Sequence, residues 1–316
     1  MNDRAQSQHT IALTGATGFV GQHTLDLLLD RGHSVRALCR QAQHKMHPHL
    51  TWIDGSLQNQ TALEQIVSGV DCVIHIAGTI KASSRASFFE GNEQGTANLV
   101  DAMSQTEAPP HMVHLSSLAA RDPHLSAYAA SKRAAETVVQ AYQGGSNAVI
   151  LRPSAVYGPG DMETMFYFKS AVAAFAAVPG KGSHRTSLIH VQDLANALVA
   201  LAEQNVRIAE PLSIDDGKEG GYAVEEVLDL ISPDKRRTTL YLPYAALWGI
   251  AAIGSLFAGL AGKTPMLTTG KARELCHDDW VCNRPSLNET GFWSPQIEGQ
   301  RGLQQTLAWY EENSLV

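Results

Sequence analysis

The chain has 316 residues, of which 44% are hydrophobic and 17% are charged. This balance permits a large buried core and excludes an intrinsically disordered chain. The formal net charge is -7, and no cluster of Lys and Arg could follow a phosphate backbone, so a nucleic-acid partner is not expected. The N-terminal MNDRAQSQHT lacks the positive-then-apolar layout of a secretory signal, so we expect a cytoplasmic protein. No metal site or redox pair is predicted, because no CxxC or Cys/His spacing joins Cys39, Cys72, Cys276 and Cys282.

Short β-branched runs alternate with longer helical patterns in the first half of the chain. A strand at 9–15, a helix at 24–32 and a strand at 33–40 begin this alternation. Further strands are predicted at 50–53, 71–76, 111–115 and 148–151, with helices at 61–69, 92–105 and 128–142. The pattern predicts an α/β fold with a doubly wound parallel sheet of at least six strands, the Rossmann type.

The rhythm changes after residue 152. YGPGD is typical of a turn, and the stretch that follows is rich in Ala and large apolar residues. We predict that residues 1–152 form the Rossmann domain and that 153–316 form mostly a smaller C-terminal substrate-binding lobe. Residues 186–204 read again as a strand followed by a helix, and we expect them to return to the first domain.

No charged residue occurs between Arg237 and Lys263, and LYLPYAALWGIAAIGSLFAGLAG is long enough to cross a bilayer. Its many Ala and Gly residues add little transfer energy, however. Pro243 is typical of a first helical position after a short strand. We therefore expect a helix at 241–262 that is buried or contacts a membrane surface, rather than one that spans a membrane.

TGATGFVG places three glycines between a predicted strand and a predicted helix. Gly15 permits a tight turn, Gly18 lets the backbone approach a pyrophosphate, and Gly21 allows close packing of helix on strand. The helix N-terminus also favours phosphate, although tight strand–helix packing alone would use the same glycines. We predict that the domain binds a nicotinamide dinucleotide through Gly15, Thr17, Gly18, Phe19, Val20 and Gly21.

The end of the second strand bears on which dinucleotide binds. NAD sites place an acidic residue there for the ribose 2′-hydroxyl, whereas this chain has Cys39 and Arg40. A guanidinium can hold a 2′-phosphate in bidentate fashion, which favours NADP(H). NAD(H) stays open, because Arg40 could instead be a solvated surface residue, and Lys45 or His44 could share the phosphate contact.

YAASK places Tyr128 and Lys132 four residues apart on one predicted helix, so that both project from the same face. A free phenol has a pKa of about 10, and a neighbouring ammonium stabilises the phenolate and favours proton exchange with a carbonyl or alcohol. HLSSLAA ends a strand at the edge of the sheet where ligands bind, and Ser117 would polarise the reacting oxygen, while Ser116 supports the strand end. Singly, these residues are also compatible with a surface Tyr–Lys pair and a Ser-rich turn. Together they predict a catalytic Ser117, Tyr128 and Lys132, with the last two also holding the cofactor.

With VIHIAG, NEQGT, LRPSAVYGPGD and LIHVQDLANAL, these motifs resemble the extended short-chain dehydrogenase/reductase family over nearly the whole chain. That superfamily includes sugar-nucleotide epimerases, dihydroflavonol reductases and 3β-hydroxysteroid dehydrogenases. The resemblance implies that Ala77 and Gly78 lie along the adenosine side and that Pro153 through Val156 lie against the nicotinamide. It favours Ser117 over Ser116 and implies a supporting role for Asn92, which could also be an ordinary helix cap.

Two positions depart from the family pattern. The family's Gly-Asp-Leu at the adenine is Gly55, Ser56 and Leu57 here, which retains Leu57 as a cofactor contact but removes the acidic contact unless Asp54 replaces it. SSLAARD also lacks the Thr-Asp-Glu run of sugar-nucleotide dehydratases, so dehydratase chemistry is not expected.

The predicted lobe is apolar, and only Lys169, Lys181 and Arg185 could serve a diphosphate, so we expect an apolar ketone or alcohol as substrate. Lipid-, steroid- and flavonoid-like molecules fit this description. The apolar residues could instead form the lobe's own core. Two alternative functions remain: a sugar-nucleotide epimerase with tightly bound NAD, and a non-catalytic dinucleotide-binding subunit similar to complex I-associated relatives. Family members often dimerise, so a homodimer is one implied assembly.

Overall fold

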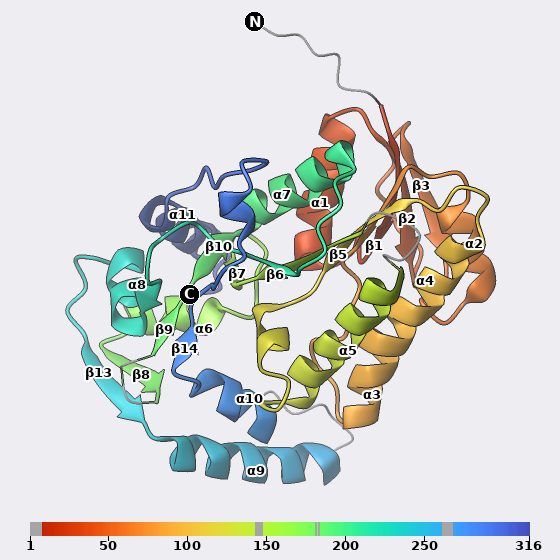
Figure 1. Cartoon of the computed structure of the whole chain (residues 1–316). Coiled ribbons are helices and arrows are strands. Elements are labelled where there is room, and N and C mark those ends of the chain that lie inside the picture. The colour runs from red at the N-terminus through yellow and green to blue at the C-terminus, as the bar shows by residue number, and fades with distance from the viewer. Residues whose placement is uncertain (1–7, 143–147, 181, 183, 261–267) are drawn as a thin grey trace, which may run out of the picture.

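The structure is a computed structural model that describes all residues except 1–7, 143–147, 181, 183 and 261–267 (Figure 1). Its centre is a seven-stranded sheet in the order β11-β6-β5-β4-β1-β2-β3, with every neighbouring pair parallel. The strands are β1 Thr10–Thr14, β2 Ser34–Cys39, β3 Leu50–Asp54, β4 Cys72–His75, β5 His111–Leu115, β6 Ala148–Pro153 and β11 Leu212–Ile214. The predicted doubly wound parallel sheet is confirmed, and β11 adds a strand that the sequence did not indicate.

Helices cover both faces of this sheet. Helices α1 (Phe19–Asp30) and α7 (Val191–Gln204) lie side by side on one face, and α2 (Gln60–Val67), α4 (Gly95–Ser104) and α5 (Ala127–Tyr142) cover the other (Figure 1). Alternate residues of one strand serve the two layers: Ile11 and Leu13 pack toward α1 and α7, whereas Ala12 packs toward α2 and α4. This packing places the ends of the parallel strands at one common edge.

Only part of the segment 186–204, which we predicted to return to the first domain, packs on the central sheet. Its helix α7 packs on the central sheet beside α1, as the buried side chains of Leu194 and Leu198 show. Its strand β10 (Leu188–His190) lies outside the seven-stranded sheet and pairs with β7 (Ala155–Tyr157).

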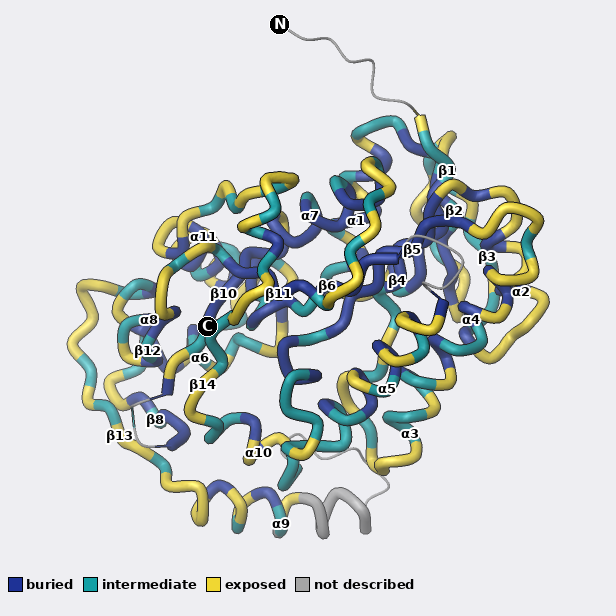
Figure 2. The backbone as a smooth tube through the Cα atoms, viewed as in Figure 1, coloured by how far each residue is buried: buried dark blue, intermediate teal, exposed yellow. Residues whose placement is uncertain are grey.

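Elements outside the central sheet form a second hydrophobic core around Tyr157, Phe168, Leu228 and Tyr310, while Leu247, Ala251 and Ala272 form a small separate cluster. Figure 2 shows the buried segments of this part of the chain. The strands here are β8 Phe175–Pro179, β9 Arg185–Thr186, β12 Tyr222–Ala223, β13 Thr238–Leu242 and β14 Asp279–Trp280. The helices are α6 Met165–Val172, α8 Val224–Ile231, α9 Tyr244–Leu260, α10 Thr269–Leu275 and α11 Gly299–Glu312. Short helical turns complete the chain at α3 Arg85–Phe89, η1 Glu90–Gln94, η2 Leu118–Arg121 and η3 Leu287–Glu289.

The uncharged segment forms the expected helix, α9, after the strand β13, and Pro243 immediately precedes its first residue. Among the described residues, no helix has both the length and the apolar character that a membrane span requires. Helix α9 lies along the outer edge of the molecule below α10 (Figure 1). All four cysteines are free thiols.

Candidate active site

The glycine-rich loop joins β1 to α1 at the common edge of the sheet. Gly15 has a φ of +79°, and a Cβ there would lie 2.6 Å from the backbone nitrogen of Ala77. A Cβ at Gly21 would lie 1.9 Å from the carbonyl oxygen of Gly15, so helix and loop touch directly. Gly18 is the N-cap of α1, and a Cβ there would contact only that same oxygen, at 3.4 Å. The loop is therefore closed on its inner side and open above the first turn of α1, which fits a bound pyrophosphate.

The predicted adenosine-side residues follow the next two strands. The backbone nitrogen of Ala77, after β4, donates to Thr14 Oγ1 at 3.3 Å. A Cβ at Gly78 would lie 2.9 Å from Asn92 Oδ1, so no larger residue fits there without movement. Leu57, after β3, is buried, and its carbonyl oxygen accepts a hydrogen bond from Asn98 Nδ2 at 2.8 Å. These residues therefore follow the carboxyl ends of β3 and β4, on the same edge of the sheet as the glycine-rich loop.

Arg40 is exposed directly after the last residue of β2. Lys45, which the sequence analysis named as a residue that could share the phosphate contact, forms an ion pair with Asp26 of α1. Asp54, the last residue of β3, stands opposite Cys39 in the sheet and is exposed. Arg40 is thus the cation at this strand end that could meet a 2′-phosphate, with Asp54 on the neighbouring strand.

Ser117 and Tyr128 come together from different elements. Ser117 is the N-cap of η2, and its Oγ accepts a hydrogen bond from the backbone nitrogen of Ala119 at 3.2 Å. Tyr128 lies in the first turn of α5, with the ring of Phe88 edge-on to it at 6.2 Å between centroids. Burial raises the pKa of Tyr128 to about 12, and a side-chain hydrogen bond with Ser117 acts in the lowering direction. The pKa of the phenol is therefore raised, whereas we expected the neighbouring ammonium to lower it.

Lys132 lies one turn further along α5, and its side chain is almost completely enclosed, with 5% of the residue exposed. Its Nζ donates a hydrogen bond to the carbonyl oxygen of Leu115 at 2.8 Å. Burial lowers the pKa of Lys132 to about 8, and the carboxylate of Glu136 acts in the raising direction. A Cβ at Gly78 would lie 3.8 Å from Nζ, so the ammonium lies close to the loop that follows β4.

Two histidines of the sheet lie near this ammonium. His75 of β4 and His114 of β5 are paired in register and buried, with ring centroids 5.1 Å apart. Burial lowers the pKa of His75 to about 3 and that of His114 well below its usual value, and the charge of Lys132 adds to both effects. Both rings are neutral, so the cation at this site is Lys132.

Asn92 is not a helix cap. It lies in the π-helical turn η1, where it is buried. Its Oδ1 accepts from the Thr79 nitrogen at 2.7 Å, and its Nδ2 donates to the Thr79 carbonyl at 3.0 Å and to Ser131 Oγ at 2.8 Å. Ser131 Oγ in turn donates to the carbonyl oxygen of Tyr128 at 2.8 Å. Asn92 therefore ties the loop that carries Gly78 to the helix that carries Tyr128.

A buried carboxylate behind the site was missed by the sequence reasoning. Glu136 accepts from Ser116 Oγ at 2.6 Å and from Nε and Nη2 of Arg152 at 2.7 and 2.6 Å. The backbone nitrogen of Ser116 also donates to the Leu151 carbonyl at 2.7 Å, as its expected role at the strand end requires. The spacing of four between Lys132 and Glu136 was the available signal, because both then share one helix face. This ion pair fastens α5 to the ends of β5 and β6.

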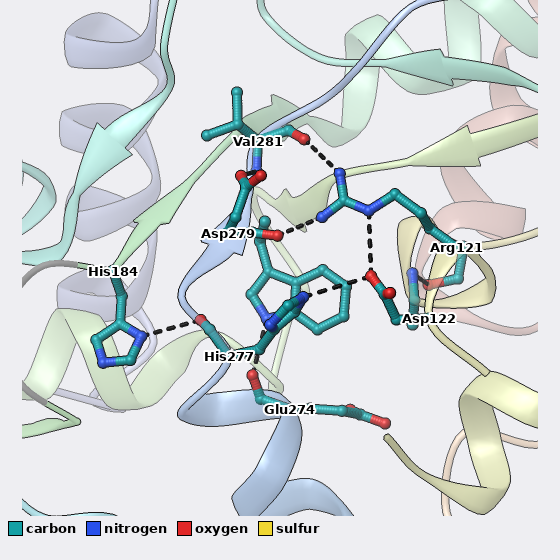
Figure 3. Close-up of polar contacts among 10 residues, drawn as sticks. Arg121, Asp122, His184, Glu274, His277, Asp279 and Val281 are labelled. Carbon is teal, nitrogen blue, oxygen red and sulfur yellow. Dashed lines mark hydrogen bonds and ion pairs between the residues drawn. The ribbon is translucent and has the colours of Figure 1, made fainter. Parts of the chain in front are cut away.

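A second missed group ties the short helix capped by Ser117 to the C-terminal part of the chain (Figure 3). Arg121 Nη1 donates to the Val281 carbonyl at 2.9 Å. Asp122 Oδ2 lies 3.2 Å from Arg121 Nε and 3.3 Å from His277 Nε2, and His184 Nδ1 lies 2.9 Å from the His277 carbonyl oxygen. The segment before and within β14 thus holds η2 in place.

The chain leaves the sheet at Pro153, the buried last residue of β6. Val156, expected against the nicotinamide, is half-buried in β7 opposite Ile189. The loop after β7 then returns to α1, where His23 Nε2 lies 2.9 Å from the carbonyl oxygen of Pro159. This loop therefore contacts the helix that follows the glycine-rich loop.

The same loop also meets the one that follows β4. Lys81 Nζ and Glu163 Oε1 form an ion pair at 2.5 Å, and the neighbouring residues Ile80 and Met162 are exposed apolar side chains. Apolar surface therefore flanks the point where the two loops join.

The site residues and the sheet define a dinucleotide-dependent enzyme, and comparison with known proteins agrees. The family model described as "NAD dependent epimerase/dehydratase family" matches residues 11–214. The chain belongs to this family and is an NAD(P)-dependent oxidoreductase of the extended short-chain type.

Among its relatives, the chain is 33% identical to a ceramide reductase of Caulobacter vibrioides, over 95% of this chain and 94% of the relative. It is 26% identical to a 2-alkyl-3-oxoalkanoate reductase of Stenotrophomonas maltophilia, over 94% and 98%. A solved UDP-glucose 4-epimerase of Thermotoga maritima shares the fold with a TM-score of 0.71, at 18% identity over 96% of this chain and 99% of that one.

Proposed function

We propose that the protein is an NADP(H)-dependent reductase that interconverts a ketone and a secondary alcohol on an apolar, lipid-like substrate. Residues 1–152 hold the cofactor, and residues 153–316 supply most of the substrate contacts. The observation that carries the proposal is the arrangement of three side chains: Tyr128 interacts with Ser117 and lies one helical turn from the enclosed ammonium of Lys132.

This arrangement serves proton transfer at a carbonyl oxygen. NADPH, when bound, supplies the hydride that reduces the carbonyl carbon. Ser117 orients the substrate oxygen by hydrogen bonding, and Tyr128 gives that oxygen its proton, so the ketone becomes an alcohol. The positive charge of Lys132 stabilises the phenolate that remains until solvent returns a proton. In the reverse direction, the same phenolate accepts the proton of the alcohol.

The surroundings of the phenol favour an apolar substrate over a nucleotide sugar. Phe88 packs against Tyr128, and Ile80 and Met162 are exposed next to the Lys81–Glu163 ion pair that joins the loops after β4 and β7. Arg185, a candidate for binding a diphosphate, already donates to the carbonyl oxygens of Gly220 and Gly221. Lys181 lies outside the described residues. The two reductase relatives that match almost the whole chain are named for acyl-chain substrates, which supports the same substrate class.

The expected apolar segment of the lobe divides between core and surface. Phe168 is part of the second core, whereas Phe166 and Phe175 are exposed. A substrate therefore meets only some of these side chains, and the rest stabilise the lobe.

The NADP preference rests on Arg40. Its exposed guanidinium follows the second strand directly, and no carboxylate stands at that strand end to repel a 2′-phosphate. Asp54 on the neighbouring strand would weaken this preference without supplying the usual NAD contact at the second strand.

The proposal is tested by titrating NADPH and NADH and then measuring NADPH oxidation on a panel of ketones graded by hydrophobicity. We expect tighter binding of NADPH and a kcat/KM that rises with chain length. Turnover of UDP-glucose without added cofactor, together with NAD that stays bound through purification, would instead show an epimerase.

A further inference from the structure

Helix α9 and the adjoining strand β13 present an apolar face to solvent. We call it the α9 face, and it consists of exposed large side chains: Leu240, Tyr241, Tyr244, Trp248 and Ile250. Among the α9 side chains that the structure describes, Leu247 and Ala251 are the buried ones, and they pack on Ala272 of α10. Figures 1 and 2 show the helix at the periphery, with most of its described surface exposed. Over the part of α9 whose side chains are described, the helix thus buries one narrow stripe and exposes most of its other apolar residues.

Exposing these apolar side chains to water is energetically unfavourable. Trp248 and Ile250 are 47% and 57% exposed, and α9 carries no charged residue to hydrate its surface. Contiguous exposed apolar surface of this kind marks an interaction site. Trp248 and Ile250 are two residues apart and therefore lie on opposite sides of the buried stripe, so apolar side chains are exposed on both flanks of the helix. Exposed surface of this kind suits an extended partner surface rather than a small ligand.

The charges around the face indicate the kind of surface. The sequence from Lys235 to Arg273 contains no Asp or Glu, and the acidic residues Asp234 and Glu274 directly flank this stretch. The exposed cations on the neighbouring segments are Lys235 and Arg236 before β13, and Lys271 and Arg273 on α10, of which Lys271 forms an ion pair with Glu274 at 3.3 Å. Two carboxylates come from α8: Glu225 accepts the hydroxyl hydrogen of Tyr241, and Asp229 lies 3.6 Å from Arg237.

We propose that the α9 face docks on the surface of an anionic lipid bilayer, with the helix lying in the plane of the interface. Tyr241, Tyr244 and Trp248 combine an apolar ring with a polar edge, which suits the headgroup region. Ile250 would insert among the upper acyl chains, and the cations of the neighbouring segments would meet the lipid phosphates. This occupant satisfies both the apolar face and the neighbouring cations.

The docked face lies one helix away from the catalytic phenol. Helix α10 packs on α9, and Glu274 of α10 accepts a hydrogen bond from Ser126, two residues before Tyr128. A bilayer-dissolved substrate would therefore enter the site from the membrane side. This consequence rests on the proposed function, whereas the docking itself does not depend on it.

The test is co-sedimentation of the full chain with vesicles of phosphatidylcholine alone or of equal parts phosphatidylcholine and phosphatidylglycerol. We expect binding to the anionic vesicles that falls as salt rises from about 0.1 M to about 1 M, where charges are screened. The affinity of the double variant Trp248→Ser/Ile250→Ser for these vesicles should be lower than that of the parent by at least about ten-fold. Phe292→Ser, which alters an exposed apolar residue elsewhere, is the matched control and should bind like the parent.

The proposal would be overturned if the parent did not bind the anionic vesicles at low salt, or if the double variant bound them as well as the parent does. It would also be overturned if the parent were a dimer, the double variant a monomer, and neither protein bound vesicles. The last result would assign the face to a second copy of the chain. Reduction of a water-soluble ketone should be the same in the parent and the double variant. Loss of vesicle binding with intact reduction thus separates a failure of docking from a failure of the proposed function.

Discussion

Replacing Lys132 with Met should stabilise the folded chain. Burial lowers the pKa of this ammonium from its usual 10.5 to about 8, so the fold holds the charged form at a cost. The difference corresponds to about 3 kcal/mol of lost stability. Between pH 8 and 10.5 the unfolded chain binds more protons at Lys132 than the folded chain does. The cost is therefore fully present below about pH 8 and disappears as the pH rises toward 10.5.

Urea unfolding of the parent and of Lys132→Met, near pH 7 and near pH 9.5, measures this cost. Removal of the charge favours the variant by about 3 kcal/mol at the lower pH and by about 1 kcal/mol at the higher one, and loss of the hydrogen bond to the Leu115 carbonyl subtracts about 1 kcal/mol at both. The contributions of thiols and phenols with raised pKa values to the pH dependence of stability are the same in both proteins, so they cancel when the two free energies of unfolding are compared. Lys169→Met, at an exposed position, is the control and should show no such gain. The reasoning would be refuted if the variant were less stable than the parent near pH 7, or if the difference in the free energy of unfolding were the same at both pH values.

Three further substitutions test the cofactor site and its support. Arg40→Ala should weaken NADPH binding by about 10- to 100-fold and leave NADH within about two-fold, measured by calorimetry; equal effects on both would make Arg40 a solvated surface residue. Gly21→Ala should lower the affinity for either cofactor by about ten-fold or more, because its Cβ would collide with the Gly15 carbonyl, and unchanged affinity would contradict the placement of the loop. Glu136→Gln should destabilise the fold by about 3 kcal/mol in urea, because Arg152 would lose its buried counter-charge; an unchanged midpoint would show that the pair adds nothing.

The features that the sequence predicted are local ones. Gly15 and Gly21 are required by a turn and a contact within seven residues, and the common face of Tyr128 and Lys132 follows from helix geometry alone. The strands of the central sheet were visible because buried parallel strands are short apolar runs between turn residues.

The features that the sequence did not predict depend on distant partners. Strand β11 joins the sheet through pairing of Ser213 with Arg152, and η2 is held by contacts from Arg121 to residues around β14. Asn92 lies in a π-turn whose partners are on two other elements. The pKa of Tyr128 was expected to fall because Lys132 is near, but it rises, since burial and the charge of Glu274 outweigh the hydrogen bond with Ser117, and burial cannot be inferred from residue spacing.

The central claim is that the phenol of Tyr128 moves the proton in ketone reduction. Tyr128→Phe keeps the ring beside Phe88 and removes only the hydroxyl. We predict that the variant binds NADPH within about two-fold of the parent while its kcat for ketone reduction falls by about 100- to 10,000-fold, followed by the loss of NADPH absorbance. A variant that binds NADPH normally and reduces the ketone at the parent rate would contradict the account.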